Sequence, residues 1–183
     1  YPQNPVPDYA TATLRITVPE PYGCVASGES TTGAAVVSLR DLLTLANGKA
    51  FSFKAAQPVR YLALLVSRFE HAGDKTIALS DEDARDPQGP RVKVAVEANP
   101  RQKGRGRALL GRVEEVMRFY TGLMGDAPYT SMTVALVESE LPGGHSPAYF
   151  AMLNEPLPTS GIQWRNDPAA FESFPEFFLA HEL

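Results

Sequence analysis

The sequence has little cysteine, no long apolar run and no strong excess of charge, and each shortage excludes a class of function. Cys24 is the single cysteine among 183 residues, which excludes an internal disulfide framework and a zinc site built from several cysteines. No apolar run approaches the roughly 20 residues of a membrane-spanning helix, so no membrane span is expected. The formal net charge of −4 offers no general attraction to nucleic acid, and we expect no nucleic-acid partner.

Cys24 has no histidine or cationic residue near it in the sequence. A reactive thiolate needs such a partner, whereas a buried thiol behaves as a small apolar side chain. We therefore expect Cys24 to be a buried structural residue.

The two ends of the sequence lack the usual signals of a complete chain. Residue 1 is Tyr rather than Met, and no Gly, Asn or Pro follows the last apolar run, Phe177–Leu183. We expect the sequence to be a fragment of a longer protein. An exported and a cytoplasmic origin both agree with such ends, so the compartment stays open.

The first half of the sequence has the alternation of half-buried strands. Between Thr11 and Val18, apolar residues alternate with Thr and Arg, which predicts a strand of an antiparallel sheet. The longest apolar run predicts a strand over residues 60–69 that is buried on both faces. Further strands are expected at residues 76–79 and 91–97, separated by an acidic loop over residues 81–90.

The pattern changes near residue 100. Apolar residues between Gly106 and Met124 recur at helical spacing, and Gly125 is suited to cap the helix that this spacing predicts. Strands are expected at residues 130–137 and 148–153. This order predicts an α+β fold, with a β-rich domain over residues 1–97 and the opening of a second domain over residues 98–183.

The pair His181–Glu182 is the first candidate for chemistry. Zinc peptidases carry His-Glu-x-x-His on one helix, where both histidines bind the metal and the glutamate activates water. Here the second histidine of such a motif would lie beyond Leu183. A lone His-Glu pair is often only the exposed turn of a helix. This pair, however, follows Phe177 and Phe178 on a helix apolar enough to be buried. Burial of a charged glutamate is costly, so a functional role would explain its presence there.

The glycine pair Gly143–Gly144 is the second candidate. Consecutive glycines let a backbone approach a ligand closely, although a tight connection between strands explains them equally well. His145, which follows, has no spacing that supports a role as a zinc ligand. Ser146 lacks the Gly-x-Ser-x-Gly setting of a nucleophile.

Two further sets of polar residues are not expected to carry chemistry. His71 precedes Ala-Gly-Asp in a predicted exposed turn. A basic cluster has no interleaved aromatic residues, as nucleic-acid binding would favour, and we expect a solvated linker there. The cluster consists of Arg101, Lys103, Arg105 and Arg107.

These parts, in this order, resemble the M1 family of zinc aminopeptidases. Members of that family have an all-β N-terminal domain followed by a thermolysin-like catalytic domain. The resemblance implies that residues 1–97 end the β domain, and that residues 98–183 open the catalytic domain and stop within the zinc helix. The segments that carry the resemblance are residues 59–69, 105–124, 133–139, 142–150 and 176–183.

The resemblance also implies roles for single residues. His181 matches the first zinc ligand, and Glu182 matches the general base that takes a proton from zinc-bound water as a peptide bond is hydrolysed. The remaining ligands would follow Leu183. The family's Gly-x-Met-Glu-Asn strand, whose glutamate holds the free amine of the substrate, matches residues 143–147 here, with Gly143 kept and the glutamate missing.

The resemblance implies that the parent protein is an enzyme, a zinc metallopeptidase, and that this fragment alone is inactive. With one zinc ligand in the sequence, tight zinc binding by the fragment is not expected. Self-association is expected through an uncovered face of the last helix, at Phe177 and Phe178.

A non-catalytic β-rich binding or interaction module is the alternative from a different class. Such a module explains the alternating strands and the incomplete catalytic set. It does not explain why an apolar helix should end on His-Glu-Leu. A histidine two positions after Leu183 in the natural coding region would favour the peptidase, and a stop codon would favour the module.

Overall fold

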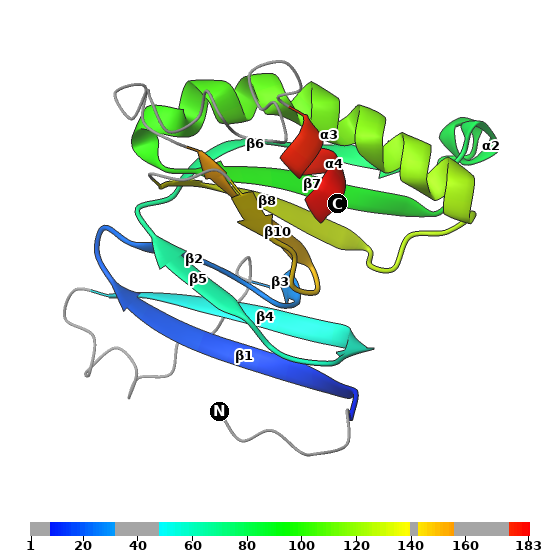
Figure 1. Ribbon diagram of the computed structural model, residues 1–183. Coiled ribbons are helices and arrows are strands. Elements are labelled where there is room, and N and C mark those ends of the chain that lie inside the picture. The colour runs from blue at the N-terminus through cyan, green and yellow to red at the C-terminus, as the bar shows by residue number, and fades with distance from the viewer. Residues whose placement is uncertain (1–7, 32–47, 140–142, 156–175) are drawn as a thin grey trace.

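The computed structural model describes residues 8–31, 48–139, 143–155 and 176–183, which form the α+β fold expected from the sequence (Figure 1). Its strands are β1 (Ala10–Pro19), β2 (Gly23–Ala26), β3 (Glu29–Ser30), β4 (Gly48–Val59), β5 (Leu64–Ser67), β6 (Glu70–Ala78), β7 (Arg91–Ala98), β8 (Ser131–Glu138), β9 (Gly143–His145) and β10 (Phe150–Glu155). Its helices are α2 (Asp81–Arg85), the short 3-10 helix η1 (Pro100–Gln102), α3 (Lys103–Met124) and α4 (Phe177–Glu182).

The largest sheet has the strand order β6-β7-β8-β10-β9. β7 and β8 are parallel, as are β8 and β10, whereas β6 and β9 lie antiparallel to their neighbours at the two edges. α3 connects β7 to β8 and lies across one face of the sheet, as Figure 1 shows. This helical connection is what a parallel strand pair requires.

The main core lies between this sheet and α3. Alternate residues of β7 point toward the helix, and Val94 and Val96 are fully buried there. Val113 and Met117 of α3 face them at helical spacing, as the sequence predicts. Gly125 ends α3 with a left-handed φ of 76°, and its N–H donates to the Thr121 carbonyl at 2.8 Å, which confirms the predicted cap.

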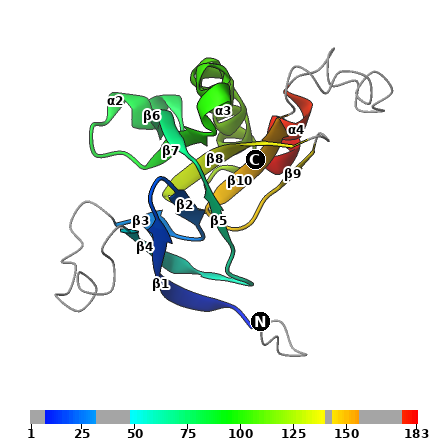
Figure 2. The same ribbon diagram turned by 90° about the vertical axis from the view of Figure 1, so that its left-hand side faces the viewer.

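The other face of the sheet is covered by smaller antiparallel units (Figures 1 and 2). One unit has the order β1-β4-β3, and β1 confirms the strand predicted from Thr11 to Val18. The other unit pairs β2 with β5. Cys24 on β2 is buried, and burial raises the pKa of its thiol to about 11. It therefore stays protonated at neutral pH, as expected of a structural residue.

The prediction of one strand over residues 60–69 is wrong. β4 continues to Val59, and β5 spans only Leu64–Ser67. Leu64 and Val66 are 55% and 40% exposed. The reason is that no described segment packs on the face of β5 that carries Leu64 and Val66. Its other face packs on the main sheet through Leu65.

Three segments predicted as turn, loop or linker are regular structure. His71 and Asp74 lie within β6, where a bulge between His71 and Gly73 replaces the predicted turn. The acidic loop contains α2, whose first turn is capped by the Ser80 side chain. The basic cluster belongs to η1 and α3 instead of a linker. Carboxylates of the main sheet pair with two of its members: Glu70 with Lys103 at 2.8 Å, and Glu155 with Arg105 at 2.9 Å.

The division expected between residues 97 and 98 stays a prediction for the whole protein. β6 and β7, which precede this point, pair in the same sheet as β8, β9 and β10, which follow it. Among the described helices, none is long and apolar enough to cross a membrane.

Candidate functional site

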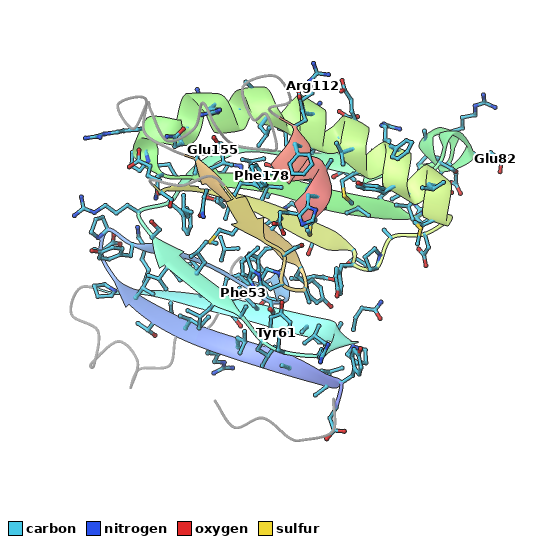
Figure 3. The ribbon with its side chains drawn as sticks, in the orientation of Figure 1. Phe53, Tyr61, Glu82, Arg112, Glu155 and Phe178 are labelled. Atoms are coloured by element: carbon cyan, nitrogen blue, oxygen red, sulfur yellow. The ribbon has the colours of Figure 1, made fainter. Side chains whose placement is uncertain are left out.

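α4 lies on the same face of the main sheet as α3 and packs against β10 and β9 (Figure 3). Leu179 is buried in the main core. Arg112 of α3 pairs with Glu176 at the start of α4, with 3.3 Å between Nε and Oε1. The Tyr120 hydroxyl donates to the Ala180 carbonyl at 2.8 Å. Side chains of α3 therefore hold both ends of this short helix.

α4 is less buried than its sequence predicts. His181 is exposed, with its ring stacked on that of Phe177 at a centroid distance of 6.1 Å, and Glu182 is only half-buried. Phe177 is 46% exposed, whereas Phe178 and Leu183 pack against the main core. α3 and β10 already cover the apolar face of the helix, so the structure gives no support to the expected self-association.

The structure brings three of the candidate residues together. Gly143 and Gly144 lie on β9, the edge strand beside α4, and Glu182 reaches across to this strand. A Cβ atom at Gly144 would lie 2.6 Å from both Cγ and Oε1 of Glu182. No real Cβ tolerates such a distance, so only glycine leaves the room that this carboxylate occupies. His181, by contrast, lies on the exposed side of α4.

The residues after Gly144 hold β9 in place. The Ser146 hydroxyl donates to the backbone carbonyl of Glu182, and the His145 ring stacks on Tyr61 at a centroid distance of 6.3 Å. Tyr149 is buried, and its φ of 74° is unusual for a bulky residue. Its Oη accepts a hydrogen bond from the Gln57 N–H at 3.0 Å. Sequence reasoning missed Tyr61 and Tyr149, because neither belongs to a motif.

His181 is the residue that the sequence predicts as a zinc ligand. Catalytic zinc takes three protein ligands in addition to water. His181 offers one exposed imidazole, whereas Glu182, the next residue in the sequence, is directed toward β9. Within the part of the chain that the structure describes, no group of three or more His, Cys, Asp and Glu side chains could hold a metal ion. These residues alone therefore do not make a zinc site.

His71 is exposed as predicted, but its ring lies between two carboxylates. Nδ1 is 2.8 Å from Glu97 Oε1, and Nε2 is 3.1 Å from Asp74 Oδ1. The hydrogen bond with Glu97 is the main cause that raises the pKa of His71 above its usual value. The imidazolium form is therefore favoured in the folded state.

This raised pKa predicts a pH-dependent contribution to stability. The contribution should be fully present below the ordinary histidine pKa of about 6.5, and should disappear as the pH rises through the folded-state pKa. Denaturant unfolding of the chain and of His71→Gln between pH 5 and 9 would measure it. The stability difference should shrink with rising pH, and a constant difference would contradict the prediction.

Comparison with known proteins reveals a likeness in structure alone. No family model and no curated protein matches the chain. The fold is similar to the crystal structure of an M1 zinc metallopeptidase from Deinococcus radiodurans, with a TM-score of 0.58 and 20% identity over 82% of this chain and 31% of that one. A mutant of a two-domain M1 zinc metallopeptidase bound to L-tryptophan gives a TM-score of 0.58 and 21% identity, over 79% of this chain and 30% of that one.

The chain thus spans about a third of the length of these solved structures. At this level of identity, the likeness concerns the fold. The chain has the fold of one part of an M1 zinc metallopeptidase.

Proposed function

We propose that this chain belongs to an M1-like zinc metallopeptidase that hydrolyses peptide bonds, and that it ends the β domain and opens the catalytic domain. The observation that carries the proposal is the contact of Glu182 with Gly144. It puts a half-buried carboxylate, a group able to accept a proton, directly against an edge strand. The shared fold supports the same assignment.

β9 is suited to hold a peptide beside this carboxylate. An edge strand has unpaired backbone N–H and C=O groups, to which an extended peptide can add as a further strand. Gly143 and Gly144 carry no side chain that would hinder this approach. The peptide backbone would then lie next to Glu182.

His181 is the proposed zinc ligand, and Glu182 the proposed general base. Zinc, when bound in the parent protein, would polarise the attacking water. Glu182 would accept a proton at its carboxylate. The described residues offer one imidazole, so the proposal places the remaining ligands elsewhere in the parent protein.

The His181 assignment predicts a joint loss of metal and activity in the parent protein. His181→Ala should lower the zinc content and peptide hydrolysis together, because a three-ligand site loses one ligand. A chelator should abolish hydrolysis in the unaltered protein, and added zinc should restore it. Metal analysis and a peptide-cleavage assay measure both quantities.

His71→Gln is the matched control, because it removes a histidine from β6 on the opposite edge of the sheet. It should change neither zinc content nor hydrolysis. Full zinc content in His181→Ala would refute the ligand assignment. Absence of hydrolysis in the zinc-loaded parent protein would favour the non-catalytic module.

A further inference from the structure

The position of the edge strand β9 depends on the short link, residues 146–149, that joins it to β10. β9 has three residues and, among the described strands, pairs with β10 alone, over residues 152–154. Figure 2 shows β9 at the edge of the main sheet, beside α4. A strand this short is held weakly by its own ladder. The contacts of the link therefore decide where β9 lies.

Tyr149, the last residue of this link, has a backbone conformation that its surroundings must impose. Its φ is 74°, and among the described residues other than glycine it is the only one with a positive φ. A bulky side chain disfavours this left-handed region, so the conformation persists only where tertiary contacts determine it. The side chain is 2% exposed. The contacts of Tyr149 therefore set the direction of the link.

Elements outside β9 and β10 hold Tyr149. Its Oη accepts a hydrogen bond from the Gln57 N–H of β4 at 3.0 Å. Gln57 lies where the register between β4 and β1 is interrupted, so its N–H is available for this bond. The Tyr149 carbonyl accepts a hydrogen bond from the Thr133 N–H of β8 at 3.0 Å. Its ring packs on that of Tyr129, with 4.2 Å between the centroids.

The other end of the link is held by α4. The Ser146 hydroxyl donates to the backbone carbonyl of Glu182. β9 thus has one anchor on α4, through Ser146, and another on β4 and β8, through Tyr149. The approach between them is already close, because a Cβ at Gly144 would lie 2.6 Å from Glu182 Oε1. A shift of the link therefore changes the distance between β9 and the Glu182 carboxylate.

We infer that Tyr149 is a positioning residue of the Glu182 site. The hydrogen bond from Gln57 to its hydroxyl fixes β9, and a peptide added to β9, relative to the Glu182 carboxylate. The inference rests on the proposed function, in which a peptide lies along β9. Such a peptide would move together with the strand, so a loosened link should slow the reaction and leave binding unchanged.

Tyr149→Phe in the parent protein tests the inference, because it removes the hydroxyl and keeps the buried ring. kcat for a peptide substrate should fall about tenfold: a displacement of a full ångström costs about a hundredfold, and the ring still limits the shift. KM and zinc content should stay unchanged. A residue that only stabilises the fold would lower the unfolding temperature without changing kcat of the folded enzyme. Steady-state kinetics well below that temperature, with metal analysis, separates the two roles.

Gln57→Pro removes the other partner of the same hydrogen bond. Since the Gln57 N–H donates to Tyr149, a proline at this position breaks no bond between β4 and β1. This variant should lose kcat by the same factor, and adding Tyr149→Phe to it should cost nothing further. Tyr22→Phe is the matched control, because it removes a hydroxyl from an exposed tyrosine between β1 and β2, and it should retain full kcat.

A third background shows whether Tyr149 acts through Glu182. In Glu182→Gln, the added Tyr149→Phe should have little effect, because the proton acceptor that it positions is already lost. An equal fold-loss in both backgrounds would overturn the inference. So would an unchanged kcat in Tyr149→Phe and Gln57→Pro, or a loss confined to KM. Absence of hydrolysis in the unaltered, zinc-loaded parent protein would refute the proposed function and, with it, this inference.

Discussion

Replacing Glu182 with glutamine in the parent protein is expected to lower peptide hydrolysis by about 10²- to 10⁴-fold, the usual contribution of a general base. The amide has the shape of the carboxylate and still fits against Gly144, but it cannot accept a proton. Zinc content should stay unchanged, because the proposed ligand is His181. Steady-state kinetics on a peptide substrate, with metal analysis of the same sample, measures the effect.

Glu115→Gln is the matched control for this substitution. Glu115 is an exposed carboxylate on α3 that pairs with Arg112, and its loss should leave kcat unchanged. Wild-type hydrolysis in Glu182→Gln would remove the general-base assignment, even if the protein proves to be a zinc enzyme. A simultaneous loss of zinc would instead make Glu182 part of the metal site.

The second large effect is expected from Gly144→Ala. The added methyl group would lie 2.6 Å from Cγ and Oε1 of Glu182, so the carboxylate must move. The side chain is flexible, and the fold should survive. The proton acceptor, however, is displaced by an ångström or more, for which a loss of about 10²-fold in kcat is typical. Zinc content should not change. Kinetics and thermal unfolding of the variant would test both expectations.

Gly122→Ala provides the control for the added methyl group itself. Gly122 lies in α3, and a Cβ there would meet no atom within 4 Å. This variant should retain full activity and gain up to about 1 kcal/mol in the free energy of unfolding, because alanine favours the helix. Unchanged kcat in Gly144→Ala would show that the position of Glu182 does not govern the reaction.

Local patterns in the sequence predict the elements whose residues repeat regularly. β1, β7 and α3 have clear periods of 2 or 3.6 residues, and all three occur where they are expected. The strand predicted over residues 60–69 was wrong, because an apolar run alone does not reveal whether other segments will pack on both faces of a strand. The parallel pairing of β7, β8 and β10 has no local signal, since it depends on α3 crossing the sheet.

The sequence predicts which residues belong to the candidate site, but it does not predict how they are arranged in space. His181–Glu182 and Gly143–Gly144 each stand out in the sequence, yet nothing in it indicates that Glu182 touches Gly144. That contact depends on α3 holding α4, through Tyr120 and Arg112, beside the edge of the sheet. His181 is exposed, as the alternative interpretation of an exposed helical turn predicts. The buried helix that we expected from the neighbouring apolar residues does not describe it.

The parallel pairing of β7 with β8 makes the two halves of the chain interdependent. A single cut between residues 97 and 98 would leave the buried valines of β7 on one piece. The helix α3, which covers them, and β8, which pairs with β7, would be on the other. Each piece would expose half of a core, so the two would be soluble only as a complementing pair. A cut in the short link between Ser67 and Glu70 would leave every strand of the main sheet on one piece. It would divide only the smaller clusters, such as the one in which Val25 packs with Ala135 and Phe150.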